Sequence, residues 1–156
     1  MRTWILALLL AGCAAPDRTT STMSNLPQPS ALHPAELVGF LATSDSARSR
    51  AFYVDKLGFR VRSEDGIALV LDADGRMIRV QKAREHVPRP YTVLGWNVAD
   101  IEAAVARLAK AGVRCELFGF PGQDARGIMT FEDGTRVAWF KDPDGNILSV
   151  AQIAGL

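Results

Sequence analysis

The sequence predicts an α+β fold in which two paired βαβββ modules form an open, cleft-bearing eight-stranded sheet. The first observation is a repeat: the strand, helix and turn pattern of residues 45–58 recurs at 100–112. The second is a matched turn that follows in each copy, Asp72-Ala-Asp74-Gly75 and then Asp142-Pro143-Asp144-Gly145. An internal repeat of this kind indicates two copies of one supersecondary unit.

The first module covers about residues 35–82. Residues 36–43 are mostly apolar and predict a strand. Ser44 or Asp45 can cap a helix that runs through Lys56 and ends at Gly58. Apolar or alternating runs separated by Asp-Gly turns then predict three strands, at 59–63, 67–71 and 77–82.

The second module covers about residues 91–153 and repeats this order. After a strand at 91–98, Asp100 caps a helix that Gly112 ends, with its apolar residues at helical spacing: Ile101, Ala104, Val105 and Leu108. We expect further strands at 114–118, 135–141 and 146–152. Residues 128–131 predict an extra short hairpin that the first module lacks.

The N-terminus has the features of a secretion signal over residues 1–12. Arg2 precedes an apolar run at 4–10 that is too short to span a bilayer, and small residues follow. The segment Leu10-Ala11-Gly12-Cys13 resembles a bacterial lipoprotein signal, which implies cleavage before Cys13 and its lipidation. Several acyl chains would then anchor the protein to a membrane. A plain secretion signal and a spanning helix are the alternatives.

Residues 13–34 contain the lipidated Cys13 and a segment rich in Ser, Thr, Pro and Gln with no apolar period, which predicts a flexible linker. The domain, residues 35–153, would then lie in the periplasm. Ala14 follows Cys13 in place of the Asp that marks inner-membrane retention in enteric bacteria, which favours the outer membrane.

Charge and cysteine content argue against a nucleic-acid-binding protein and against a disulfide-stabilised domain. The chain has 18 basic and 17 acidic side chains, so nothing favours nucleic-acid binding, which depends largely on phosphate neutralisation. Cys115 is the only thiol besides Cys13. The domain therefore has no internal disulfide, and its stability must come from packing.

The two modules, together with short motifs, resemble the vicinal oxygen chelate superfamily, which includes glyoxalase I, extradiol dioxygenases and bleomycin-resistance proteins. The motifs are Phe52-Tyr53, Leu57-Gly58 and Asp142-Pro143-Asp144-Gly145-Asn146. The resemblance implies that each module curls its sheet into a half-cup. It also implies that enzymes of the superfamily hold a divalent metal with His, Gln or Glu from the first and fourth strands of both modules.

The repeat locates those ligand positions twice. Seven residues before each capping Asp lie Val38 and Val93, and four residues after each turn glycine lie Arg79 and Ser149. None of the four is a plausible metal ligand. The resemblance therefore implies the fold, and we expect neither a metal nor another cofactor.

Strand alternation predicts which polar groups reach the cleft. The predicted ligand-binding residues are Arg79, Ser149, Asn97, Gln81 and Phe40. The guanidinium of Arg79 suits a carboxylate or phosphate, although an ion-paired surface role is the alternative. By the same alternation Trp96 faces the helices. A glycine-flanked loop at 119–127 is a candidate mobile lid, and three aromatic residues could line the cleft mouth: Phe118, Phe120 and Trp139.

We interpret the chain as a metal-free small-molecule-binding protein of the glyoxalase/bleomycin-resistance type, tethered to the membrane by lipid. Its ligand would be partly apolar, and an anion is one option. The alternative is a glyoxalase-like lyase or dioxygenase with an atypical site, although the predicted cleft contains no His, Asp or Glu to act as a general base. A third option is a structural lipoprotein domain that serves a protein partner. A homodimer is one assembly open to such a domain.

Overall fold

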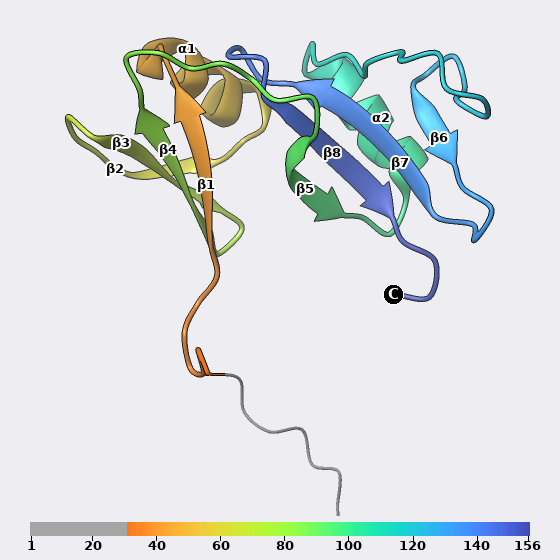
Figure 1. Cartoon of the computed structure of the whole chain (residues 1–156), viewed down its shortest axis with the longest axis horizontal. Coiled ribbons are helices and arrows are strands. Elements are labelled where there is room, and N and C mark those ends of the chain that lie inside the picture. Colours follow the sequence, from red (N-terminus) through yellow and green to blue (C-terminus); the bar gives the residue numbers. More distant parts are fainter. Residues whose placement is uncertain (1–30) are drawn as a thin grey trace, which may run out of the picture. The chain divides into compact units, whose positions relative to one another are not determined.

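The computed structural model describes residues 31–156, of which Glu36–Leu156 form one compact unit (Figure 1). The predicted signal peptide at 1–12, the lipidation of Cys13 and most of the linker at 13–34 lie outside the described residues. Among residues 31–156, no helix has the length and apolar character needed to cross a bilayer.

The first module has the predicted βαβββ order. Its elements are β1 (Val38–Thr43), α1 (Ser46–Arg50), the π-helical segment η1 (Ala51–Lys56), β2 (Arg60–Glu64), β3 (Ala68–Ala73) and β4 (Arg76–Lys82). The strands form a sheet in the order β1-β4-β3-β2, in which only β1 and β4 are parallel. Asp45 caps α1 by accepting a hydrogen bond from the Arg48 amide at 3.0 Å.

The second module repeats this arrangement. Its elements are β5 (Thr92–Asn97), α2 (Ile101–Lys110), β6 (Ile128–Thr130), β7 (Arg136–Lys141) and β8 (Ile147–Gln152). The sheet order is β5-β8-β7-β6, again with the first pair parallel. Asp100 caps α2 at the Ala103 amide. The predicted α+β class with two βαβββ modules is confirmed, and the eight strands form two four-stranded sheets.

The predicted strand at 114–118 is wrong. In that stretch only Cys115 makes a β-bridge, with Phe140, and the strand next to β7 is β6, which the sequence had suggested as an extra hairpin. The side chain of Gln123 explains the difference, because its oxygen accepts hydrogen bonds from the Phe118 and Gly119 amides at 2.9 and 3.2 Å. The Glu116 amide still donates to the Trp139 carbonyl of β7 at 2.7 Å, so pairing with β7 ends after Glu116, where the Phe118 and Gly119 amides bond to a side chain.

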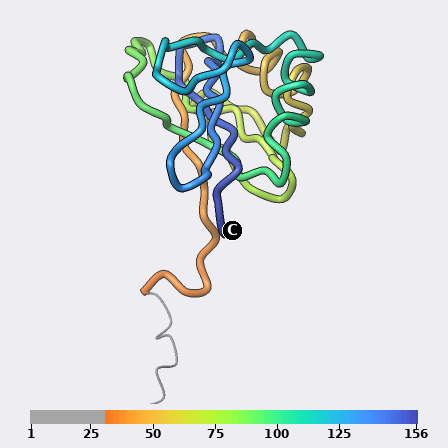
Figure 2. The backbone as a smooth tube through the Cα atoms, turned by 90° about the vertical axis from the view of Figure 1, so that its right-hand side faces the viewer, coloured from red at the N-terminus to blue at the C-terminus, as the bar shows by residue number. Residues whose placement is uncertain are grey.

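The core lies between the sheets and the helices, which lie on the same side of both sheets (Figure 2). Alternate strand residues such as Leu71, Val80 and Leu148 are buried on that side, in one apolar cluster that spans both modules. Trp96 packs against this cluster and stacks on Phe140 with ring centroids 6.4 Å apart, which confirms that it faces the helices. Burying one such side chain stabilises the fold by about 1.5–3 kcal/mol.

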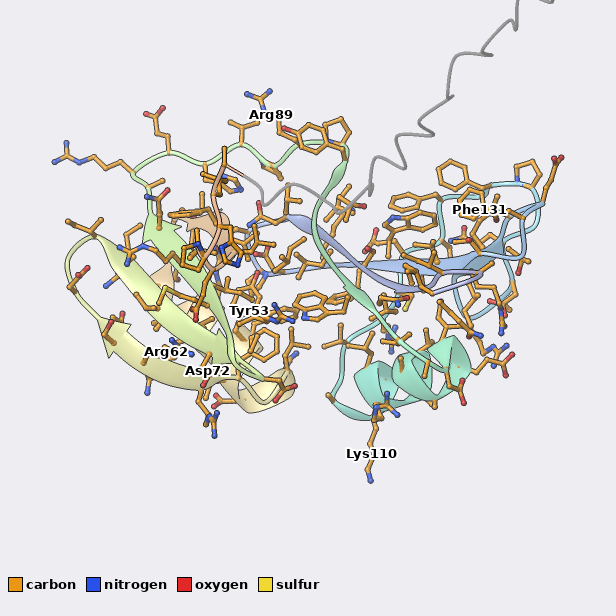
Figure 3. The ribbon with its side chains drawn as sticks, turned by 90° about the horizontal axis from the view of Figure 1, so that it is seen from below. Tyr53, Arg62, Asp72, Arg89, Lys110 and Phe131 are labelled. Atoms are coloured by element: carbon orange, nitrogen blue, oxygen red, sulfur yellow. The ribbon has the colours of Figure 1, made fainter. Side chains whose placement is uncertain are left out.

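The turn between β7 and β8 joins the modules. The carboxylate of Asp144 accepts hydrogen bonds from the Thr43 hydroxyl at 2.6 Å and from the Ser44 amide at 2.9 Å. The hydroxyl of Tyr53, which lies between the two sheets (Figure 3), donates to Asp142 at 2.7 Å. These contacts hold the end of β1 and the first helix against the second module.

Candidate functional site

The face of the first sheet that points away from the helices carries three of the predicted ligand-binding residues. Phe40 of β1, Arg79 of β4 and Val70 of β3 lie side by side in register. Gln81 lies two residues along β4, opposite Ala42, and is exposed. Because Phe40 is 56% exposed, this face offers an apolar surface next to a guanidinium.

Arg79 differs from the other arginines on this face in its partners. Arg60 and Arg62 both pair with the carboxylate of Asp72, at 2.8 and 3.6 Å. Hydrogen bonds from the Gly75 amide and then from Arg60 lower the pKa of Asp72, so this acid stays charged and paired. Arg79 makes no ion pair within 4.0 Å in the part of the chain that the structure describes, although its charge helps to lower the pKa of Asp65 after the backbone hydrogen bonds from Ala68 and Ile67.

Ser149 lies on the corresponding face of the second sheet, in register with Gly95 and Trp139. A Cβ at Gly95 would lie only 2.5 Å from the Ser149 hydroxyl oxygen, so a glycine is needed beside it. The indole nitrogen of Trp139 donates to the Thr92 hydroxyl at 3.0 Å. Ser149 is only 8% exposed, so it forms part of the floor of this face and offers a ligand little surface.

Asn97 is the fifth predicted residue, and a backbone contact occupies its oxygen. That oxygen accepts a hydrogen bond from the Ile153 amide at 3.2 Å, which fixes the chain after β8. The structure therefore gathers Phe40, Arg79 and Gln81 on one sheet and places Ser149 and Asn97 on the other.

Three aromatic side chains form a cluster beside the second sheet. The ring centroids of Phe118, Phe120 and Trp139 lie 5.5 to 6.1 Å apart. The loop at 119–127 is held from within, because the amide nitrogen of Gln123 donates to the carbonyls of Glu116 and Gly127 at 3.0 and 3.1 Å. That the loop at 119–127 acts as a mobile lid stays a prediction. The structure does show that the rings of Phe118 and Phe120 are exposed.

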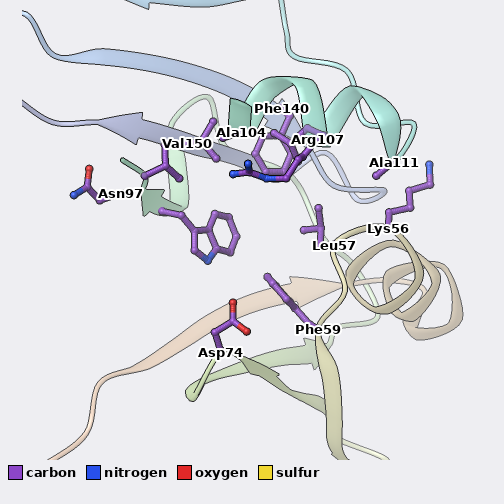
Figure 4. Close-up of a pocket in the computed structure, with 13 residues that line it drawn as sticks. Lys56, Leu57, Phe59, Asp74, Asn97, Ala104, Arg107, Ala111, Phe140 and Val150 are labelled. Atoms are coloured by element: carbon purple, nitrogen blue, oxygen red, sulfur yellow. The ribbon is translucent and has the colours of Figure 1, made fainter. Parts of the chain in front are cut away.

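A cavity of about 510 Å³ lies on the helix side, between the two modules (Figure 4). Its lining includes the aromatic residues Phe59, Trp96 and Phe140 and three charged residues, Lys56, Asp74 and Arg107. This cavity was not predictable from the sequence, because it depends on how the modules pack against each other. Of the predicted ligand-binding residues only Asn97 is part of this lining, and the other indication was Trp96, a large side chain on the helix face of β5.

A family model decides the relationship of this fold to known proteins. The model of the glyoxalase/bleomycin resistance protein/dioxygenase superfamily matches residues 32–150. The chain belongs to this superfamily. A comparison with curated protein sequences returns no match.

Solved structures of this superfamily share the fold at low sequence identity. A bleomycin resistance determinant encoded on transposon Tn5 is 18% identical, with a TM-score of 0.61 over 77% of this chain and 98% of that one. A glyoxalase family protein from Enterococcus faecalis is 22% identical, with a TM-score of 0.58 over 75% and 94%. A lactoylglutathione lyase from Agrobacterium tumefaciens is 16% identical, with a TM-score of 0.59 over 76% and 93%.

The residues at the four positions where the sequence resemblance expects a metal do not fit a divalent metal. Val38 and Val93 offer hydrocarbon, and the guanidinium of Arg79 has no lone pair to donate. The fourth position, Ser149, is a neutral hydroxyl. Within residues 31–156 no group of three or more His, Cys, Asp or Glu side chains is placed to hold a metal ion.

Proposed function

We propose that this superfamily member is a metal-free binding protein for a small, partly apolar anion, which it takes up on the open faces of its sheets. The observation that carries the proposal is the adjacent pair of Phe40 and Arg79, an exposed ring beside a cation that has no ion-pair partner among the described residues. A ligand with an apolar body and a carboxylate or phosphate would meet both groups at once. Gln81 would add a hydrogen bond at the edge of the same face.

The second sheet supplies a complementary surface. Its face carries Trp139 with Phe118 and Phe120, of which Phe118 is 38% and Phe120 is 47% exposed. Because this aromatic cluster and Arg79 belong to different sheets, a second copy of the chain could bring them together across a dimer interface. A homodimer is therefore part of the proposal, and it would also cover the exposed rings.

The lipid anchor rests on the sequence around Cys13. We propose that Cys13 is lipidated and holds the domain at the periplasmic side of the outer membrane. Expression in a Gram-negative host with radiolabelled palmitate should label the wild-type protein and leave Cys13→Ser unlabelled. Equal labelling of both proteins would refute the anchor and leave the ligand proposal untouched.

A ligand screen tests the binding proposal. Thermal unfolding of the purified chain, measured with a panel of small organic carboxylates and phosphates, should find compounds that raise Tm. Arg79→Gln should abolish the shift, whereas Arg89→Gln in the linker between the modules should keep it. A full ligand response in Arg79→Gln would remove Arg79 from the site.

Metal analysis separates this proposal from a lyase or dioxygenase. The purified chain is exposed to Zn, Ni, Mn and Fe and then dialysed. We expect substoichiometric metal, because the four superfamily positions hold Val38, Arg79, Val93 and Ser149. One equivalent of metal retained after dialysis would favour the enzyme instead.

A further inference from the structure

We propose that the cavity between the modules is a second binding site, separate from the open faces, for a small aromatic carboxylate. Its volume of about 510 Å³ falls within the range of roughly 300–1,000 Å³ that is usual for sites of small ligands. Residues from both modules line it, among them Leu57 and Phe59 from the first and Leu108 and Val150 from the second. A molecule bound there would contact both halves of the domain.

The wall of the cavity suits a flat apolar body. Phe59 and Trp96 have ring centroids 5.9 Å apart, and Trp96 stacks on Phe140 at 6.4 Å. Phe59, which directly precedes β2, and Trp96 of β5 are partly exposed and form an aromatic wall across the junction of the modules, whereas Phe140 of β7 is 1% exposed and supports Trp96. An aromatic ring can pack against such a wall in an offset or edge-to-face arrangement.

The charges at the cavity select an anion. Lys56 and Arg107 are both exposed cations, and Asp74 is the acid in the lining. Within residues 31–156 Arg107 makes no ion pair, and the hydrogen bond that Lys56 makes to the Gly112 carbonyl is long, at 3.4 Å. Two cations that do not pair with acids in the described part of the chain, beside an apolar wall, provide the usual recognition of a carboxylate.

The placement of the charges also orients the ligand. Arg107 reaches the cavity from α2, whereas Asp74 lies across the cavity in the turn between β3 and β4 (Figure 4). A carboxylate would therefore lie toward Lys56 and Arg107 and away from Asp74. A dianion with charges at both ends would be repelled at the Asp74 end, which favours a monoanion.

Two tryptophans allow the two sites to be told apart in one experiment. Trp96 lines the cavity, whereas Trp139 lies in the aromatic cluster of the open face. The indole ¹H–¹⁵N cross-peaks of the full chain, assigned with Trp96→Phe and Trp139→Phe, are followed during titration with 2-naphthoate. We expect the Trp96 peak to shift and saturate, with little change at Trp139.

The neutral analogue and charge variants test the role of the cations. 2-Naphthamide has the same shape without the charge, and we expect it to bind about tenfold more weakly, as expected for loss of one charge-assisted contact. Arg107→Gln should weaken 2-naphthoate binding by a similar factor, and Lys56→Gln by less because its ammonium is a more strongly hydrated group. The matched control Arg89→Gln should bind as the wild type does.

Three outcomes would overturn the proposal. The first is no saturable shift of Trp96 at millimolar 2-naphthoate in a chain whose spectrum is that of a folded protein. The second is a shift confined to Trp139, which would place the anion on the open face and support only the proposed function. The third is equal affinity for the acid and the amide, or an unchanged affinity in Arg107→Gln.

The two proposals can also fail separately. If the thermal-unfolding screen finds no ligand that depends on Arg79 but the Trp96 peak shifts and saturates, only the proposed function is refuted and the cavity site is supported.

Discussion

The two matched turns of the repeat have similar sequences and opposite environments. In the first, Asp72 pairs with surface arginines and accepts a hydrogen bond from the Gly75 amide at 2.6 Å. In the second, Asp142 is buried and accepts hydrogen bonds from the Tyr53 hydroxyl and from the Asn146 amide at 2.7 and 2.9 Å. The first turn thus stays a local feature at the surface, whereas the second connects the modules.

The same contrast separates the second aspartate of each turn. Asp74 lies beside the cavity, and its carboxylate makes no hydrogen bond or ion pair among the described residues. The side chain of Asp144 is 1% exposed and receives hydrogen bonds from Thr43, Ser44 and Ser49. A repeated turn sequence therefore predicts the local backbone, and the surroundings decide whether its carboxylates stabilise the fold.

Truncating the first aspartate of each turn, Asp72 or Asp142, should give the largest difference in the free energy of unfolding. Asp142→Ala leaves the buried hydroxyl of Tyr53 and the amide of Asn146 without an acceptor, and we expect it to lower the free energy of unfolding by about 3 kcal/mol. Asp72→Ala removes exposed ion pairs and should have a much smaller effect. Urea unfolding of the two variants measures both. Equal losses would mean that the second turn does not connect the modules energetically.

Lowering the pH should remove the contribution of Asp144 to the free energy of unfolding. Burial by itself would raise the pKa of Asp144, but the hydrogen bonds from Thr43, Ser44 and Ser49 outweigh it and lower the pKa. A lowered pKa in the folded state means that the stabilisation is complete above the unfolded-state value of about 4 and is lost as the pH falls through the folded value.

We therefore expect Asp144→Asn to destabilise the protein by about 2 kcal/mol at pH 7 because the charged acceptor is lost. Near pH 3 the variant and the wild type should differ less. Urea unfolding at both pH values measures the change. Asp74→Asn is the matched control, since Asp74 makes no comparable contacts. A constant difference between Asp144→Asn and the wild type across this range would contradict the assigned pKa direction.

Substituting the turn glycines should give a smaller difference in the free energy of unfolding. Gly75 and Gly145 have nearly equal positive φ values, 86° and 84°, so alanine at either position costs about 1–2 kcal/mol. A Cβ at Gly75 would meet nothing within 4 Å, whereas one at Gly145 would lie 3.0 Å from Cγ of Pro88. Gly145→Ala should therefore be the more destabilising by up to about 1 kcal/mol. A larger loss in Gly75→Ala would show that the contact with Pro88 is readily relieved.

Sequence reasoning predicted what depends on local pattern. The repeat, the capping residues Asp45 and Asp100, and the alternation that places Phe40 and Arg79 on one face all depend on neighbours in the chain. The strand at 114–118 failed because the side chain of Gln123 bonds to amides that a strand would use. The buried network around Asp142 and the cavity beside Trp96 were not predictable, since both require the two modules to be docked.

The smallest effect on stability should come from Asp74, and it tests the cavity as well. Asp74 has a φ of 50°, which Asn tolerates well, so Asp74→Asn should change the free energy of unfolding by less than about 0.5 kcal/mol. The substitution removes the acid from a lining that also holds Lys56 and Arg107. We therefore expect 2-naphthoate to bind about two- to threefold more tightly at low salt, with the gain reduced as salt is added. Weaker binding in Asp74→Asn would mean that the anion does not lie near these charges.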